Sequence, residues 1–554
     1  MLRPLVVALA LLLGLIACDR TPAAAPPATP GPDLTSTTGL ATPASPEPTP
    51  TDRAAPTLRY AIAEPAQLVP IDAVSPEEKL VVDTLFDSLT RLGPNMMARP
   101  SAATEWEASD DARVWRFTLR AGAAFHDGSP VTSGDFAFAW SQAAATGRAG
   151  FLLSDVEGYA DVAAGAAETL TGVRAVDDLR LEVRLARPRG DLPVIVAHPA
   201  LAPLATAAWR ADEAAYRRAP VGNGPFSAAE DRAPRQFLRV QAFPGWRNGE
   251  RPAELDEVLF QFLDAETAYL AFQQDRLQVG PLPREALDAA QAAYGTSVDG
   301  YRGPGVLQGV TPSVYFLGFN VRQPPFDVPD VRRAISLALD RDAMAAAVQG
   351  ASAVPASSVT SPLIRTAPAA TCSACTQDRR TARQILADHG VTRLEFTFNG
   401  DGGHQEIANQ VRRDLRAVGV RSVRFSTPDF DAYLDELGAG DAGFFRFGWT
   451  PEHPTPGDVL EPLFSSDGTH NYTGYADPGV DQLLAEAGAD TSALRRGVLY
   501  LLAERRVVSR DQVVTPLFFY RHQLVVSPRV EGFVLDPMGL ANLEEVRLAP
   551  PATS

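Results

Sequence analysis

The sequence lacks the short motifs that mark the common hydrolases and nucleotide-binding enzymes. It has no Gly-x-Ser-x-Gly elbow, no His-Glu-x-x-His zinc motif and no glycine-rich phosphate loop ending in Lys-Ser or Lys-Thr. Its 7 histidines are scattered, and no cysteine is placed as a nucleophile. We therefore expect no catalytic residue, no bound metal and no cofactor, and we expect a protein that binds its substrate without transforming it.

Lysine is almost absent. Lys79 is the only lysine in the 554 residues, so the other basic residues are all arginine. Acidic residues outnumber basic ones by 67 to 50, and the net charge of −17 argues against a nucleic-acid partner, which requires basic patches. We interpret the arginine-rich and alanine-rich composition as the mark of a GC-rich genome rather than of a function.

Cysteine is scarce as well, with 3 residues in the chain. Cys372 and Cys375 form a Cys-Ser-Ala-Cys pair, and Cys18 lies near the N-terminus. With no second pair nearby, and outside the cytoplasm, a local disulfide between Cys372 and Cys375 is the favoured reading. Free thiols or a metal site remain the alternatives.

A long apolar run occurs only near the N-terminus, from Leu5 to Ile16. Arg3 precedes it and Ala17-Cys18 follows it, which predicts a secretory signal, because a membrane-spanning helix needs about 20 apolar residues. The sequence Leu-Ile-Ala-Cys resembles the bacterial lipobox, which implies that Cys18 is lipidated and begins the mature protein. A plain signal peptide with an incidental cysteine is the alternative.

Residues 19–56 are dominated by Pro, Ala, Thr and Ser and have almost no large apolar side chain after Leu40. Such a segment cannot bury enough surface to offset its chain entropy, so we expect a disordered tether. Together with residues 1–18, it predicts an extracytoplasmic protein held to the membrane by a lipid, in the periplasm or on the outer face of the cytoplasmic membrane.

The remaining 500 or so residues exceed one hydrophobic core and suffice for two or three domains. Val114 to Arg120 alternates as a strand, and Thr132 with Asp135 fits a helix capping box. Val314 to Phe319 is a further strand, and Asp330 is expected to cap the helix that follows. Strands and helices alternate from there to Val420, which indicates an α/β fold.

Three stretches of this body, in the same order, resemble the bacterial extracellular solute-binding proteins of the peptide, dipeptide and nickel importers, which feed an ATP-driven permease. The similarity runs from about Leu58 to Val534. Its most specific residues are Glu105-Trp106-Glu107 with Trp115 to Arg120 and Phe125 to Gly128, then Phe319-Asn320 with Pro324 to Phe326 and Val331 to Arg341, then Trp449, Pro454, Pro456 and Asn471 to Tyr475.

The resemblance implies an α/β periplasmic-binding-protein-like fold of two lobes joined by hinge strands, with an extra subdomain in the first lobe. Lobe 1 would comprise residues 57–91, 220–310 and 516–554, the extra subdomain residues 92–219, and lobe 2 residues 311–515. A small ligand, in the first instance an oligopeptide or dipeptide, would bind between the lobes. The implied partners are ABC permease and ATPase subunits, with the binding protein itself a monomer.

The same resemblance points to the ligand site. Peptide-binding relatives carry an Asp three residues after the tryptophan that matches Trp449, and it pairs with the α-ammonium of the ligand. Here that position is Glu452, and a charge-assisted bond to a buried ammonium contributes about 1.5–3 kcal/mol. A rim position, or a ligand without an amine, are the alternatives. Phe447 and Trp449 are expected as apolar walls, with packing in the core as the alternative, and Asn471 and Tyr472 as lining residues.

Two other functions remain open from the sequence. A binder of a nickel chelate or another non-peptide solute would use His453, beside Glu452, as a ligand. A peptide-signal receptor would use the same site without transport. Arg332 and Arg333 are expected to form a solvated helix face with structural ion pairs rather than an anion site.

Overall fold

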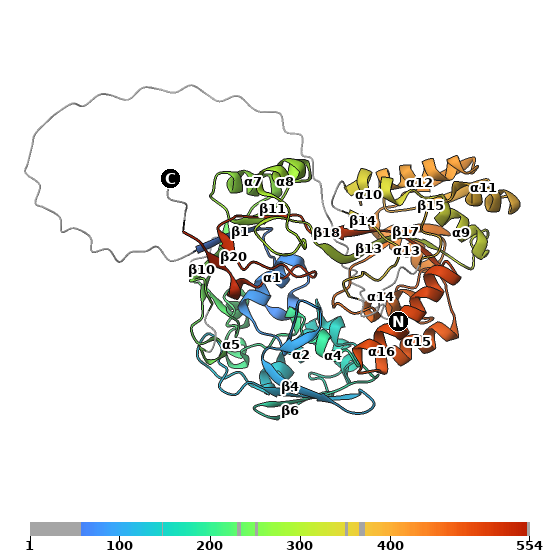
Figure 1. Ribbon diagram of the computed structural model, residues 1–554. Coiled ribbons are helices and arrows are strands. Elements are labelled where there is room, and N and C mark those ends of the chain that lie inside the picture. Colours follow the sequence, from blue (N-terminus) through green and yellow to red (C-terminus); the bar gives the residue numbers. More distant parts are fainter. Residues whose placement is uncertain are drawn as a thin grey trace, which may run out of the picture.

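The computed structural model describes residues 57–146, 148–229, 234–249, 253–349, 353–364 and 372–550. The expected signal sequence, Cys18 and the expected tether lie outside the described residues. None of the helices in the described ranges combines the length and apolar character needed to cross a membrane. In Figure 1 a first body, coloured blue to green with the red C-terminal segment of β20, and a second, coloured yellow to red, stand on either side of the strands near β18.

Lobe 1 is built on a seven-stranded mixed sheet. Its central strand β1 (Thr57–Ile62) alternates between exposed and buried residues at first and then becomes fully buried, as expected for a strand inside a sheet. Helix α1 (Pro76–Leu85) starts with a complete capping box, in which Ser75 and Glu78 exchange hydrogen bonds. The other elements are β8 (Phe226–Ala228), β9 (Phe237–Ala242), β10 (Glu257–Phe262), β11 (Val279–Pro281), β12 (Gly305–Leu307), β19 (Leu524–Val526), α7 (Ala265–Gln273) and α8 (Leu287–Tyr294).

The extra subdomain carries a four-stranded sheet of its own. On β5 (Val114–Leu119) the side chains of Trp115, Phe117 and Leu119 are buried while their neighbours are not, which confirms the predicted alternation. The backbone N–H of Thr132 donates to Asp135 (2.9 Å), the return bond expected at the start of α2 (Ser133–Thr146). The remaining elements are β4 (Ala103–Ala108), β6 (Val173–Asp177), β7 (Arg180–Arg184), α3 (Tyr159–Ala163), α4 (Leu192–Ile195), α5 (Thr206–Ala211) and α6 (Glu213–Arg218).

Lobe 2 is a six-stranded sheet in the order β14-β18-β13-β17-β15-β16, covered by helices on both faces. One face packs on α9, α11 and α12, and the other on α14, α15 and α16. Its elements are β13 (Val310–Phe319), β14 (Ala353–Pro355), β15 (Arg393–Thr397), β16 (Ser422–Ser426), β17 (Phe444–Trp449), β18 (Val514–Arg521), α9 (Pro329–Ala338), α10 (Arg341–Gln349), α11 (Arg379–Asp388), α12 (Gln405–Ala417), α13 (Phe430–Ala439), α14 (Gly457–Phe464), α15 (Pro478–Ala489) and α16 (Ala493–Arg505).

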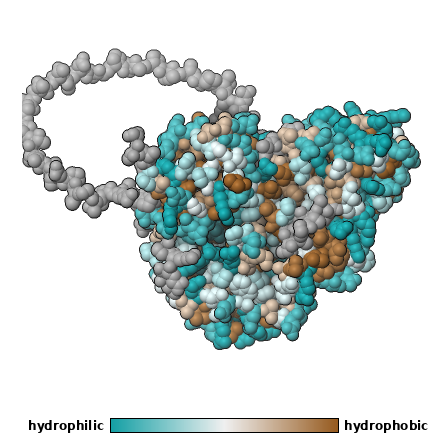
Figure 2. Space-filling view, viewed as in Figure 1, coloured by the Kyte–Doolittle hydropathy of each residue, from teal (hydrophilic) through white to brown (hydrophobic). Residues whose placement is uncertain are grey.

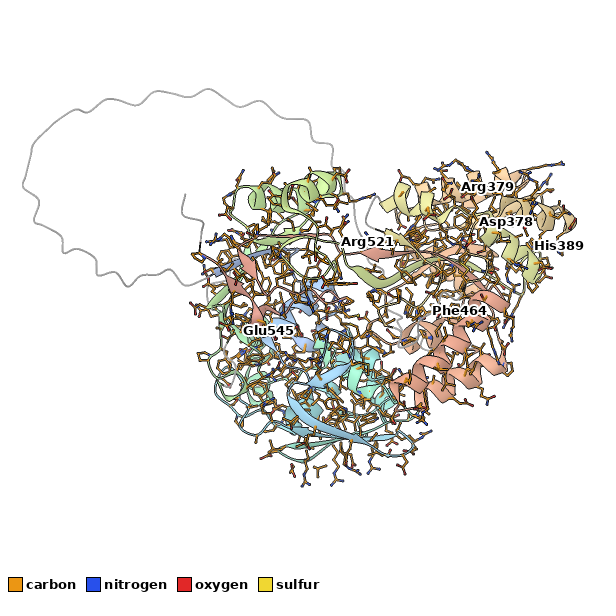
Figure 3. All side chains as sticks on the ribbon, in the orientation of Figure 1. Asp378, Arg379, His389, Phe464, Arg521 and Glu545 are labelled. Carbon is orange, nitrogen blue, oxygen red and sulfur yellow. A yellow bond between two sulfur atoms is a disulfide. The ribbon has the colours of Figure 1, made fainter. Side chains whose placement is uncertain are left out.

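The chain crosses between the lobes twice, and the two crossings lie side by side. The first joins β12 to β13, and the second joins β18 to β19. Val310 pairs with Arg521, and the backbone N–H of His522 donates to the carbonyl of Gly309 (2.8 Å). Figure 3 labels Arg521 at this junction between the two bodies. The second crossing comes later than the expected boundary at residue 516, because β18 stays in the lobe 2 sheet as far as Arg521.

Two local expectations in lobe 2 were wrong. Asp330 lies inside the first turn of α9, whose N-cap is Val328, so it does not cap the helix. Arg332 is not solvated: it is 3% exposed and donates to the backbone carbonyls of Phe326 (2.6 Å), Asp511 and Gln512 (3.0 Å). An arginine fork can satisfy several carbonyls at once, so this side chain ties the start of α9 to the turn before β18.

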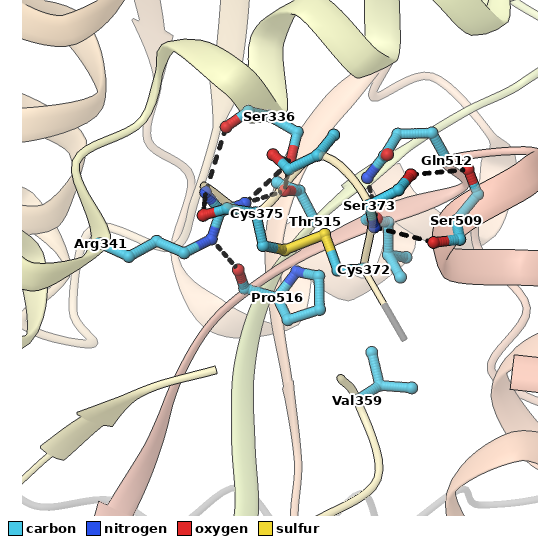
Figure 4. The surroundings of a disulfide bond; sticks show 12 residues. Ser336, Arg341, Val359, Cys372, Ser373, Cys375, Ser509, Gln512, Thr515 and Pro516 are labelled. Atoms are coloured by element: carbon cyan, nitrogen blue, oxygen red, sulfur yellow. Dashed lines mark hydrogen bonds between the residues drawn. A yellow bond between two sulfur atoms is a disulfide. The ribbon is translucent and has the colours of Figure 1, made fainter. Parts of the chain in front are cut away.

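A disulfide joins Cys372 and Cys375. The guanidinium of Arg341 lies next to it and donates to the carbonyls of Cys375 (3.0 Å) and Pro516 (2.7 Å) and to the hydroxyl of Thr515 (2.6 Å), as Figure 4 shows. The disulfide loop is therefore fastened to β18 through one buried side chain.

Hydrophilic residues dominate the face of the molecule shown in Figure 2, and the brown patches on it are local. Of the large apolar side chains in the described ranges, those more than a third exposed are Phe151, Val176, Leu270, Val298, Leu494, Val498 and Leu502. Leu494, Val498 and Leu502 follow one another at four-residue spacing and share one face of α16, whereas the other exposed apolar residues are isolated, which is ordinary for a globular protein.

Candidate functional site

Strand β17 ends in a half that pairs on one side only. Its residues Phe444 to Trp449 pair with β13, but β15 reaches β17 only through the pair Thr397 and Phe445. Among the described residues, no strand pairs with Arg446 to Trp449 on that second side, although the carbonyl of Arg446 already accepts from the Tyr433 hydroxyl. An extended backbone edge of this kind can accept a further strand through main-chain hydrogen bonds.

The loop after β17 carries Glu452 to the boundary between the lobes. Its backbone is fixed by Asp458, whose carboxylate accepts from the N–H of Glu452 (2.6 Å) and, more weakly, from that of His453 (3.4 Å). The side chain of Glu452 meets Lys79 on α1 of lobe 1, with 2.5 Å between Lys79 Nζ and Glu452 Oε2. Both side chains are largely buried, at 16% and 15% exposure.

His198, from the extra subdomain, approaches the same carboxylate oxygen. Its Nε2 lies 3.3 Å from Glu452 Oε2, but the two atoms are not aligned well enough to form a hydrogen bond. The backbone N–H of Ala200 donates to His198 Nδ1 (3.1 Å). Because Nδ1 accepts, the neutral ring carries its proton on Nε2, which faces Glu452.

The charges at this point follow from burial and pairing. Burial alone would raise the pKa of Glu452, but Lys79 and then His198 outweigh it and lower that pKa to about 2. Burial lowers the pKa of His198, so its ring is neutral at pH 7. Burial and the neighbouring Glu452 raise the pKa of Asp458 well above its usual range. The carboxylate of Glu452 is thus an anion at pH 7, and Lys79 is the cation paired with it.

Aromatic rings line the strand and the loop that follows α14. Phe447 lies edge-on to Tyr472 (5.3 Å between ring centroids), and Trp449 lies edge-on to His470 (5.1 Å). The Trp449 indole N–H donates to the carbonyl of Asp458 (2.6 Å), which couples the ring to the Glu452 loop. Phe447, Trp449 and Tyr472 are all half-buried, so part of each ring is open to a ligand.

The side chain of Asn471, expected as a lining residue, bonds within its own loop. Its amide donates to the carbonyls of Ser465 (2.9 Å) and Tyr475 (2.7 Å), and its oxygen accepts from Thr473 (2.7 Å). These bonds are internal to the loop and use the polar atoms of the side chain. Asn471 therefore shapes the loop that presents Tyr472.

A second group of charges joins the extra subdomain to lobe 2. The buried guanidinium of Arg189 pairs with Asp191 (3.1 Å) in its own subdomain and with Glu461 (2.7 Å) on α14. The backbone N–H of Gly190 donates to the carbonyl of Gly488 (2.7 Å). A small pocket nearby is lined from both sides of the boundary, by Asn95, Met96, Met97 and Val194 and by Leu363, Ile364, Pro454, Thr455, Pro456, Ala493, Arg496, Gly497 and Tyr500.

Sequence reasoning missed three side chains of the site. Lys79 and His198 come from lobe 1 and its subdomain, far from Glu452 in sequence. Arg446 is half-buried on the unpaired part of β17, where it donates to Asn399 (3.0 Å from Nε). Arg446 also helps burial to lower the pKa of His404 to about 3. The one available signal was that Lys79 is the sole lysine of the chain.

His453 lies beside Glu452 but is buried, and burial lowers its pKa to about 4. Within the described ranges, no three His, Cys, Asp or Glu side chains are grouped so as to hold a metal ion.

Comparison with known proteins assigns the chain to a family. Residues 98–471, more than half of the chain, match the family model described as bacterial extracellular solute-binding proteins, family 5 Middle. The chain therefore belongs to that family of extracellular solute-binding proteins. This confirms the family that the three sequence stretches indicated.

Individual proteins of known name are also similar to this chain over most of its length. The dipeptide-binding protein DppE of Bacillus subtilis (strain 168) is 25% identical over 490 residues, 84% of this chain and 86% of DppE. The probable deoxycholate-binding periplasmic protein YgiS of Escherichia coli (strain K12) is 26% identical, over 85% of this chain and 89% of YgiS. The unliganded open form of MppA, a periplasmic murein tripeptide-binding protein, superposes with a TM-score of 0.79 at 23% identity, over 89% of this chain and 98% of MppA.

The two-lobed α/β fold is thereby confirmed. The relatives are binding proteins rather than enzymes, as expected from the missing catalytic motifs.

Proposed function

We propose that this protein captures a peptide between its lobes and delivers it to an ABC permease, while a lipid on Cys18 holds it at the membrane. The observation that carries the proposal is the unpaired edge of β17 beyond Arg446, which runs from Phe447 to Trp449 toward Glu452 at the lobe boundary. A peptide added there as a strand would be read mainly through its backbone, with little selection for its side chains.

The neighbouring side chains support the same proposal. The half-buried rings of Phe447, Trp449 and Tyr472 offer apolar contacts beside the strand. The guanidinium of Arg446 donates to the amide oxygen of Asn399 and lies over the Tyr433 ring, 5.4 Å from its centroid, so neutral partners hold a positive charge that a carboxylate of the ligand can meet. Closure of two lobes about paired crossings would then bury the peptide.

Backbone recognition can be tested with alanine peptides of three to five residues, using the full chain purified in detergent and freed of co-purified ligand. Calorimetry should give one peptide per chain, and the peptide should be recovered intact by mass spectrometry. Methylating the central amide nitrogens removes main-chain donors and should weaken binding by about tenfold or more, since one hydrogen bond contributes about 1 kcal/mol and the methyl also blocks the approach. Equal affinity for the methylated peptide would refute strand addition.

The anchor is testable on its own. Cys18→Ser should move the protein from the membrane fraction to the soluble extracytoplasmic fraction, because the acyl chains that provide about 0.8 kcal/mol per buried methylene are then missing. Fractionation with immunoblotting measures this, and Cys372→Ser serves as the control that leaves the protein at the membrane. Unchanged retention of the Cys18→Ser variant would contradict lipidation.

A further inference from the structure

The binding site contains a cation supplied by the protein itself. We propose that Lys79 is a built-in counter-ion for Glu452, and that this pair makes the site select peptides whose amino end is blocked, for example by acylation, over peptides with a free α-ammonium. The ligand class named here rests on the proposed peptide function, whereas the role of Lys79 rests on the geometry of the pair.

The first step is the contact. Lys79 Nζ lies 2.5 Å from Glu452 Oε2, and the two residues belong to different lobes. Lys79 lies on α1, and the capping box between Ser75 and Glu78 fixes the start of this helix. No second carboxylate among the described residues lies within ion-pair distance of Lys79.

The second step is the balance of charge. One ammonium faces one carboxylate, and His198 adds no charge because burial lowers its pKa. Asp458 is already engaged within its own loop, where it accepts from the backbone N–H groups of Glu452 (2.6 Å) and His453 (3.4 Å). Arg189 is engaged with its own acids, Asp191 and Glu461. No net negative charge is therefore left at Glu452 for an incoming ammonium.

The third step is position. A strand added along β17 has one end beside the loop that carries Glu452, which begins directly after Trp449. A free α-ammonium at that end would meet the ammonium of Lys79, and two like charges in a largely buried place repel each other. Displacing Lys79 instead would leave its charge without a partner in the same place. A blocked amino end meets neither obstacle.

The test compares each alanine peptide with its N-acetylated form by calorimetry on three proteins: the full chain, Lys79→Met and Arg148→Met. The wild type should bind the acetylated form about tenfold more tightly or better, and Lys79→Met should reverse the order by a similar factor, because it frees the carboxylate of Glu452. Arg148→Met removes a neighbouring cation that pairs with Glu78 instead, and it should keep the wild-type order. A wild type that prefers the free amine, with Lys79→Met unchanged, would overturn the inference.

The single lysine provides a second measurement that needs no ligand. Protein grown with [ζ-¹⁵N]lysine has one labelled side chain, so its NMR signal reports Lys79 alone. Glu452→Gln should shift this signal, and binding of the acetylated peptide to the wild type should leave it paired. A signal that ignores Glu452→Gln overturns the pair while peptide binding stands. If neither peptide form binds any of the proteins, the proposed peptide function fails, and with it the ligand class, even where the signal shows the pair.

Discussion

Replacing Arg189 with Met is expected to lower the free energy of unfolding by about 3–5 kcal/mol, because it removes one partner of a buried ion pair and leaves the other charge uncompensated. The Arg189 side chain is 5% exposed, and that of Asp191 is fully buried. Arg189 donates to both carboxylate oxygens of Asp191, at 3.1 and 3.2 Å. Burial alone would raise the pKa of Asp191, but Arg189 outweighs it and lowers that pKa.

Arg187 is a matched control for this variant. It contacts Asp155 and lies 3.7 Å from Glu461, but its side chain is 58% exposed. Exposed ion pairs contribute about 0–1 kcal/mol, so Arg187→Met should cost little. Urea denaturation and scanning calorimetry measure both variants, and equal losses for the two would show that burial does not set the strength of this cluster. Because Arg189 also reaches Glu461 on α14, its loss should loosen the contact between the subdomain and lobe 2 as well.

Replacing Arg341 with Met is expected to destabilise lobe 2 by about 2–4 kcal/mol, since several buried acceptors lose a charged donor at once. Arg341 is 5% exposed, and burial lowers its pKa to about 10. Its guanidinium donates to the carbonyls of Ser336 (3.1 Å), Cys375 and Pro516, and to two hydroxyls. A methionine fills much of the volume but offers no donor.

The measurement is the calorimetric transition of lobe 2, with Arg333→Met as the control, because Arg333 lies on the exposed face of the neighbouring helix α9. Arg341→Lys keeps the charge but not the planar fork, so its loss should fall between those two. A transition of Arg341→Met that coincides with the wild type would mean that the disulfide loop and β18 are held together by other contacts.

Most of the strands and helix starts discussed above could be predicted from local sequence patterns. The alternation of Trp115, Phe117 and Leu119 gave the strand, and the Thr132–Asp135 capping box gave the helix start, because both depend on neighbours a few residues apart. The position of Asp330 and the burial of Arg332 were not predictable in the same way. Arg332 is buried because the turn at Asp511 and Gln512, remote in sequence, presents carbonyl groups to it.

The residues of the candidate site also fall into two groups, those close together in sequence and those that only the fold brings together. Glu452 and its aromatic neighbours Phe447 and Trp449 could be proposed because they lie within one short stretch of the chain. Lys79 could not, because 373 residues separate it from Glu452 and only the relative placement of the lobes brings them together. The composition did contain one signal. Arginine fills every other basic position of the chain, so the single lysine at position 79 stands out.

The two adjacent crossings between the lobes form a hinge about which one lobe can rotate relative to the other. Two short segments bonded to each other at Gly309 and His522 define a single axis near β18, with α4 and α16 at the opposite end of the lobes in Figure 1. In a rotation about such an axis, displacement grows with distance from it, so a small angle near β18 becomes a large separation at the far end. The bonds from Arg189 to Glu461 and from Gly190 to Gly488 lie at that end. We therefore expect these two contacts to part first when the lobes rotate, while the strand pairing near the axis stays intact.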